Sequence, residues 1–406
     1  MFRPVRLGLL LTLAAGCASV PEPDWLSALR AREAEPLPSR EIASQDRFFH
    51  ARVPARTQGE ITPIDDAYAL RLDIGSETPM DCWIYREGLD FATSLAALSD
   101  STFEAIGESF GEVEKRQIEQ VDAGVLAGHP YLGIDWLYRI ATRDGPQLGQ
   151  VKHAIASKQG RGIYCQHNEL GYSQSFRRVL GDLLAGLEFT APSDAAPYFT
   201  QVSTLAIKGM RIGLERTTLV RDDAGDTRVD TKTSLLIPVT SDTLQVSDTF
   251  GVEFARSDGS LINQVHVEAS NGELVSQLEL NPIGEDGWQV EGTFQTKPVS
   301  VRLRPASPPT SWLGEALALR HAIAHAGVGG EVRLSRWVPQ ADPTRLVDES
   351  LKVERRVEPN HFAARLAMEG LEALLVVGAD GSIASGSIPM GFASLEIERV
   401  YVSGAF

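Results

Sequence analysis

Hydrophobic and polar positions follow two different periods along the chain. Between residues 61 and 200 the period changes repeatedly between two and about 3.6, which predicts strands interleaved with helices. Leu70, Leu72 and Ile74, for example, are apolar at period two, as in a half-buried strand. From residue 201 onward period two dominates. We therefore expect an α+β protein in which a small sheet-and-helix domain (61–200) precedes a β-rich antiparallel meander or half-barrel (201–406).

Three helical segments are expected within these two domains, the first of them divided into two short helices. Apolar residues recur at helical spacing from Phe91 to Phe110, with a break near Asp100 that predicts two short helices. The stretch 172–187 has the clearest amphipathic pattern in the chain. A third helix begins at Trp312 and is expected to end at the glycine-rich stretch 327–330.

The turns of the second half predict hairpins. Asp-Gly and Asn-Gly pairs at residues 258–259, 271–272 and 380–381 separate alternating runs, and such pairs favour the left-handed backbone of tight hairpin turns. This order of strands, one helix and more strands resembles the LolA/LolB-like half-barrels of bacterial envelopes. The strand-rich middle and closing helix of 61–200 resemble PsbP-like periplasmic domains. Both resemblances are of pattern and imply an envelope location.

The beginning of the chain has the pattern of a secretory signal. Arg3 and Arg6 precede an uncharged run from Leu7 to Ala15, which is too short to span a bilayer. Leu13-Ala14-Ala15-Gly16-Cys17 resembles the lipobox of bacterial lipoproteins. That resemblance implies a signal peptide at 1–16, acylation of Cys17, and a lipid anchor in the outer membrane on its periplasmic side. An ordinary cleaved signal, with Cys17 incidental, is the alternative.

The stretch 17–60 is expected to be a tether, because its proline and acidic residues favour an extended chain with little core. A formal net charge of −16 argues against nucleic acid as a partner. Two further cysteines, Cys82 and Cys165, lie in predicted strands, and in an exported protein such a pair predicts a disulfide. Two buried free thiols are the alternative.

Candidate catalytic residues are few. Cys165 and His167 lie two residues apart and therefore on one face of a predicted strand. Ser173 lies just before a predicted helix, and Ser173 or Ser175 is better explained as the N-cap of that helix than as a nucleophile. His321 and His325 have the i, i+4 spacing of zinc ligands but lack the glutamate of zinc proteases, so we expect no metal and no cofactor. A hydrolase or transferase with Cys165 or Ser173 as nucleophile is the alternative to a non-catalytic protein.

The half-barrel resemblance implies a lipid-sized pocket on a concave sheet face. Its candidate lining residues are Leu261, Val265, Val267, Leu278, Leu280, Phe294 and Trp312. The alternative, which we favour, is plain core packed against the helix at Trp312. The sequence thus favours a membrane-anchored lipoprotein that binds or scaffolds a lipid, an acyl chain or an envelope protein.

Overall fold

The computed structural model describes residues 23–58, 61, 63–143, 145–191, 196–222, 224–391 and 393–406. These residues form four helices and three antiparallel sheets, of three, seven and fourteen strands, which confirms the β-rich α+β class. The expected signal and Cys17 lie outside the described residues. Among the described helices, none combines the length and apolar character that a membrane span requires.

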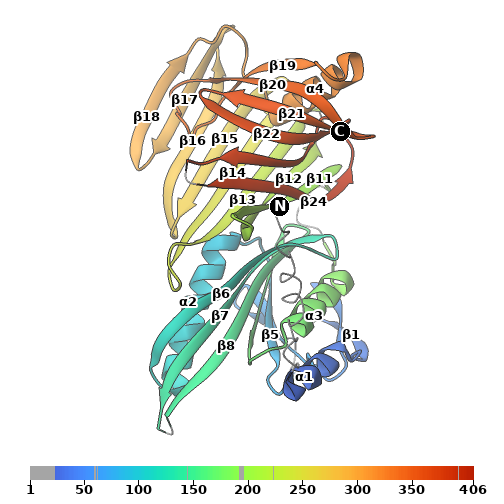
Figure 1. Cartoon of the computed structure of the whole chain (residues 1–406), viewed down its shortest axis with the longest axis vertical. Helices are drawn as coiled ribbons and strands as arrows, with labels where there is room; N and C mark the ends of the chain where they lie inside the picture. The colour runs from blue at the N-terminus through green and yellow to red at the C-terminus, as the bar shows by residue number, and fades with distance from the viewer. Residues whose placement is uncertain are drawn as a thin grey trace, which may run out of the picture.

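The seven-stranded sheet lies between two helices (Figure 1). In spatial order its strands are β3 (Pro63–Ile64), β4 (Ala67–Leu72), β5 (Met80–Tyr85), β9 (Arg161–Asn168), β8 (Gly145–Lys158), β7 (His129–Thr142) and β6 (Val113–Leu126). Successive side chains of a strand point to opposite faces. On β5, Ile84 therefore packs with helix α3 (Ser173–Gly186), and Trp83 packs on the side of helix α2 (Phe91–Phe110).

Helix α2 is continuous, so the expected break near Asp100 is wrong. Asp100 lies on the exposed face of the helix, where its carboxylate is 2.5 Å from the guanidinium of Arg116. The apolar stripe continues past it, with Phe103 and Ile106 buried. Two polar residues on the solvent side of a helix do not interrupt it, because the backbone bonds and the buried face are unaffected.

Much of the stretch expected to be a tether is folded. It contains helix α1 (Asp24–Ala34) and strands β1 (Ser39–Ala43) and β2 (Phe49–Pro54), which form the three-stranded sheet with β10 (Glu188–Phe189). Every second residue of β2 from Phe49 to Val53 is buried in the core beneath α3. The short period-two pattern of β2 is the sequence signal for this strand. The proline and acidic residues of the surrounding segment favoured a tether instead.

The fourteen-stranded sheet consists of two meanders. The first runs from β11 to β18: β11 (Phe199–Ile207), β12 (Met210–Arg221), β13 (Thr227–Pro238), β14 (Leu244–Ala255), β15 (Leu261–Ser270), β16 (Glu273–Ile283), β17 (Gly287–Phe294) and β18 (Lys297–Leu303). The second runs from β19 to β24: β19 (Glu331–Arg336), β20 (Val347–Glu358), β21 (His361–Met368), β22 (Leu371–Gly378), β23 (Ile383–Pro389) and β24 (Ser394–Gly404). They join where β24 pairs with β11.

Helix α4 (Trp312–Ala326) lies between the two meanders (Figure 1). Leu313 packs with residues of the first meander, whereas Leu319 and Ile323 pack with residues of the second. The sheet therefore curls around the helix. We call the sheet face that contacts α4 the inner face and the opposite one the outer face.

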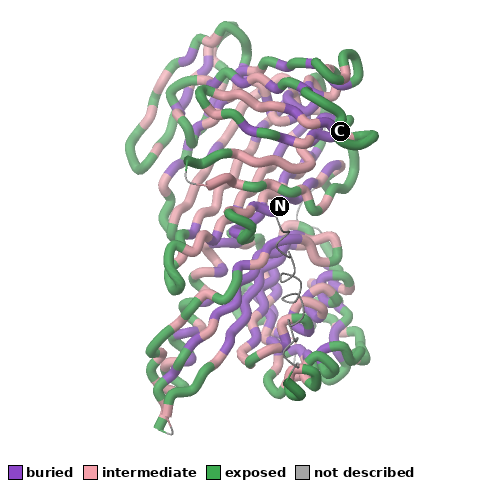
Figure 2. The backbone as a smooth tube through the Cα atoms, viewed as in Figure 1, coloured by how far each residue is buried: buried purple, intermediate pink, exposed green. Residues whose placement is uncertain are grey.

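The two halves of the chain share one hydrophobic cluster. Leu214, Leu236 and Val246 of the large sheet are buried with Phe91 and Leu95 of α2. Figure 2 shows buried backbone running through the seven-stranded sheet to this contact. The halves are therefore packed against each other through apolar side chains from both.

Candidate ligand-binding cleft

A cleft of about 570 Å³ lies between the beginning of α2 and the outer face of β12–β15. This volume falls within the ~300–1,000 Å³ typical of small-molecule sites. The residues from the first half of the chain are Gly88, Leu89, Asp90, Phe91, Pro130, Ser157 and Gly160. The residues from the large sheet are Leu214, Arg216, Arg228, Asp230, Lys232, Ser234, Asp248, Thr249, Phe250, Val252, Phe254, Val267 and Ala269.

The apolar floor follows from strand alternation. Phe250, Val252 and Phe254 are every second residue of β14 and therefore share one face. In the neighbouring strand, Val267 lies directly opposite Phe250, and Val265 lies opposite Val252. These cross-strand neighbours make a continuous apolar strip.

Basic residues of β12 and β13 border this strip. The ammonium of Lys232 lies 5.0 Å from the centre of the Phe250 ring. Burial, followed by the nearby charge of Arg216, lowers the pKa of Lys232. Arg228 is paired with Asp230, with 3.0 Å between Nη2 and Oδ2. Lys232 and Arg216 lie close enough for the charge of Arg216 to disfavour the charged form of Lys232. An anionic group placed between these two cations would therefore be attracted by both.

Asp248, which lines the cleft together with Asp90 and Asp230, is fully engaged by the protein. Its two carboxylate oxygens accept hydrogen bonds from the backbone N–H groups of Ala92 (3.1 Å) and Thr93 (2.7 Å) at the start of α2. The hydroxyl of Ser234 donates to it as well. A helix N-terminus has unpaired N–H groups and attracts negative charge, so Asp248 fixes α2 as a wall of the cleft.

The seven residues that the sequence predicted to line a pocket lie in different parts of the structure. Val267 lines the cleft, and half-buried Val265 lies beside it on the same strip. The other five do not line it. Leu261, Leu278, Leu280 and Phe294 pack with Trp288 and Trp337 in a separate core cluster, and Trp312 packs with Phe199 and Phe406.

A β-bulge explains the position of Leu261. Leu261, Val265 and Val267 have the same parity, which in a regular strand places them on one face. Between Phe254 and Ala255 of β14, however, the register shifts by one extra residue on β15, so that Asn263 pairs with Phe254 and Leu261 pairs with Ala255. The extra residue turns Leu261 to the inner face.

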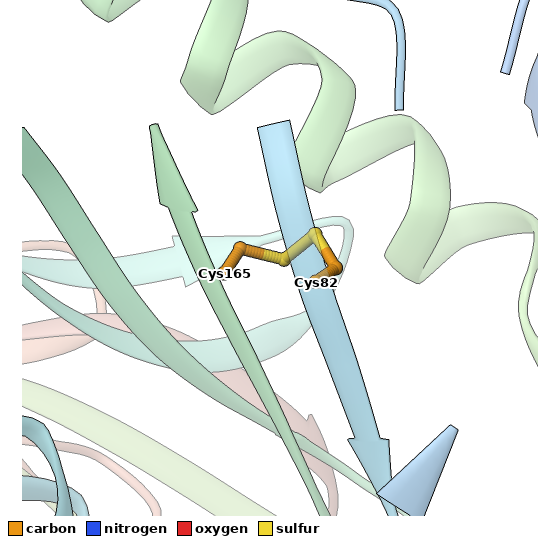
Figure 3. The surroundings of a disulfide bond; sticks show 2 residues. All are labelled: Cys82 and Cys165. Carbon is orange, nitrogen blue, oxygen red and sulfur yellow. A yellow bond between two sulfur atoms is a disulfide. The ribbon is translucent and has the colours of Figure 1, made fainter. Parts of the chain in front are cut away.

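Cys82 and Cys165 form a disulfide, as the sequence predicted (Figure 3). They lie directly opposite each other in the β5–β9 pair, and both are fully buried. While this bridge is closed, Cys165 has no thiolate for attack on a substrate. His167, two residues further on, instead contacts the hydroxyls of Ser76 and Thr78 at 3.1 and 3.2 Å.

Ser173 begins helix α3, but its side chain does not cap it, so the N-cap expectation for Ser173 or Ser175 is wrong. A carboxylate oxygen of Glu33 in α1 instead accepts the N–H groups of Gln174 (3.0 Å) and Ser175 (3.3 Å). The space beside Ser173 measures about 10 Å³, roughly that of one water. It offers no room for a substrate.

His321 and His325 project from exposed positions of α4 with their rings stacked 3.9 Å apart. The described residues contain no group of three or more His, Cys, Asp or Glu side chains with the geometry to hold a metal ion. The i, i+4 spacing of these two histidines therefore places their rings in a stacked pair on the helix surface.

Sequence reasoning missed the basic border of the cleft. Arg228, Asp230 and Lys232 alternate along β13 with residues of the inner face. The sequence signal for this border is the set of charged side chains at period two in a strand with apolar neighbours. The strand face that carries these charges must contact solvent, a partner or a ligand.

Comparisons with known proteins add no functional information. No family model matches the chain, and no curated protein matches its sequence. A β-barrel-like protein of domain of unknown function DUF1849 from Brucella abortus is 10% identical, with a TM-score of 0.41, over 52% of this chain and 98% of that one. A DUF1089 family protein from Pseudomonas aeruginosa is 15% identical, with a TM-score of 0.26, over 48% of this chain and 94% of that one.

Proposed function

We propose that this protein is a non-catalytic binding protein that holds an acyl chain with an anionic end group in the cleft between α2 and β12–β15. One observation carries the proposal: in a cleft of about 570 Å³, an apolar strip lies beside Lys232 and Arg216, whose neighbours Asp230 and Asp248 are already paired within the protein. An acyl chain would cover Phe250 and Val252, and its acidic end would approach Lys232. Burial of the chain supplies affinity, and the paired charges orient it.

The location is part of the same proposal. The lipobox-like segment ending at Cys17 supports a lipid anchor in the bacterial outer membrane, with the folded residues facing the periplasm. An anchored protein with a cleft for acyl chains would meet its ligand at the membrane surface. Binding of an envelope protein partner fits the same location.

Calorimetric titration with palmitate tests the binding. The chain with Cys17→Ser should bind palmitate, and Lys232→Glu should weaken binding about tenfold or more, since a hydrogen bond to a charged group contributes about 1.5–3 kcal/mol. Val252→Trp should block the strip. Lys297→Glu on exposed β18 is the matched control and should bind normally. Equal binding by the Lys232 and Lys297 variants would contradict the assignment of the cleft.

Hexadecanol separates the contributions of chain and charge. Hexadecanol has the chain of palmitate without the carboxylate, so the original protein should bind it more weakly than it binds palmitate. The original protein and Lys232→Glu should bind hexadecanol with equal affinity. Metabolic labelling with palmitate tests the anchor separately. Label should be incorporated into the original chain and lost in Cys17→Ala, whereas unlabelled original protein would contradict the lipoprotein proposal.

A further inference from the structure

A second polar site lies inside the curled sheet, on the opposite side from the cleft. Four glutamates gather around one arginine there: Glu215 of β12, Glu253 of β14, Glu315 of α4 and Glu349 of β20, with Arg336 at the end of β19. Glu253, Glu315 and Glu349 are buried. The cluster therefore contains four carboxyl groups for one guanidinium in a place with little water.

Most of these carboxylates have partners. Glu315 accepts a hydrogen bond from Arg336 Nη1 at 2.5 Å, and Glu349 lies 3.9 Å from the same nitrogen. Glu253 accepts the backbone N–H of Trp312 at 2.6 Å and thus caps α4. Within the described residues, Glu215 accepts one long hydrogen bond of 3.3 Å, from the Thr233 hydroxyl. Desolvation raises the pKa of Glu215, as expected for a carboxylate with so little compensation.

A small cavity of about 50 Å³ adjoins Glu215. Its lining includes Gln201, Ser203, Glu215 and Glu315. Gln201 is 5% exposed, and its side-chain oxygen Oε1 has no hydrogen-bond partner. A buried carbonyl oxygen without a donor costs about 1–3 kcal/mol. Both the carboxyl oxygens of Glu215 and the unpaired oxygen of Gln201 can therefore accept hydrogen bonds from a donor in this cavity.

We propose that this cavity binds a small monovalent cation that donates hydrogen bonds, either ammonium or the end of a primary alkylammonium. Its N–H groups would bond to Gln201 Oε1 and to the carboxylates of Glu215 and Glu315, with Ser203 as a further acceptor. One water needs about 10–15 Å³ of such space, so the cavity accommodates an ammonium group but excludes a bulky quaternary amine. A divalent metal is disfavoured because no group of three acidic or histidine side chains within the described residues has the required geometry.

Thermal unfolding of the whole protein in chloride salts of equal concentration tests this site. Ammonium and methylammonium should raise the midpoint in a saturable manner, as expected for a ligand of the folded state, and tetramethylammonium should not. Potassium should stabilise less than ammonium because it has no N–H donors. Equal midpoints in all four salts, or equal stabilisation by potassium and ammonium, would overturn the proposal.

Two variants locate the effect. Glu215→Gln keeps the shape of the side chain and should weaken ammonium binding about tenfold. Gln201→Met removes the unpaired oxygen and should weaken it about threefold, so that the test survives if one variant fails to fold. Glu291→Gln makes the same change on exposed β17 and should bind as the original protein does. Unchanged affinity in both cavity variants would overturn the assignment.

Discussion

Buried histidines link the stability of this protein to pH. His153 is fully buried, and its Nδ1 lies 2.7 Å from the hydroxyl of Tyr164, whereas Nε2 has no partner. Burial lowers its pKa to about 3, and burial likewise lowers the pKa of His167 to about 3. Unfolded histidine takes up a proton near pH 6.5. As the pH falls below 6.5, the unfolded chain gains protons that the folded chain does not, so stability is lost.

His153→Gln should therefore reduce the acid sensitivity of folding. Between pH 6.5 and pH 5 one such histidine accounts for about 2 kcal/mol of lost unfolding free energy. Urea unfolding at pH 7 and pH 5 should show a smaller difference for the variant than for the original protein. His325→Gln, at an exposed position of α4, is the control and should leave the difference unchanged.

At the residue scale, the sequence predicts the disulfide but not the pocket. The pairing of Cys82 and Cys165 could be predicted because two cysteines in strands of a protein expected to be exported tend to form a disulfide. The β5–β9 ladder places them opposite each other. The assignment of Leu261 to the face of Val265 and Val267 failed at one bulge. A bulge changes which face a residue occupies without changing the hydrophobic pattern, so parity alone does not reveal it.

At the element scale, three helices begin against carboxylates that come from other elements. Glu33 of α1 caps α3, Asp248 of β14 caps α2, and Glu253 of β14 caps α4. In α2 and α3 no side chain at the N-cap position itself makes this bond. The distant caps of α2 and α3 explain why the sequence does not show how these helices begin, whereas α4 also has a local cap, because the Ser311 side chain accepts the N–H of Gly314. A partner 155 residues away, as for Thr93 and Asp248, leaves no local motif.

Asp248→Ala should destabilise the protein by about 1–2 kcal/mol, the usual cost of losing a helix cap. The effect should be localised: hydrogen exchange of the first-turn amides of α2 should become faster, because their acceptor is gone. Asp286→Ala, in the exposed turn between β16 and β17, is the matched control. Equal exchange at α2 in both variants would show that Asp248 does not hold the helix.

At the scale of the whole molecule, the two halves share a core, since Leu214, Leu236 and Val246 of the large sheet are buried with α2. The expected boundary near residue 200 follows from the change of period, but the contact does not, because the sequence pattern describes each segment by itself. Opening the contact would expose these side chains to water. We therefore expect the halves to unfold together.

Removal of the disulfide tests this coupling. The bridge closes a separation of 83 residues within the first half, for which chain entropy predicts a loss of about 4 kcal/mol in Cys82→Ala/Cys165→Ala. Calorimetry should show one transition at a lower temperature. Two transitions, with the later one unchanged from the original protein, would mean that the large sheet unfolds independently.

The pairing of β24 with β11 has a consequence for biogenesis. Phe199 lies opposite Gly404 in this pair, so the two meanders join through contacts between segments about two hundred residues apart in the chain. During synthesis β11–β18 can assemble early, but their seam stays unpaired until β24 emerges. An exposed strand edge is a template for aggregation, and long-range pairing is slow. A chaperone that shields β11 until β24 has been synthesised would therefore protect the nascent protein from aggregation.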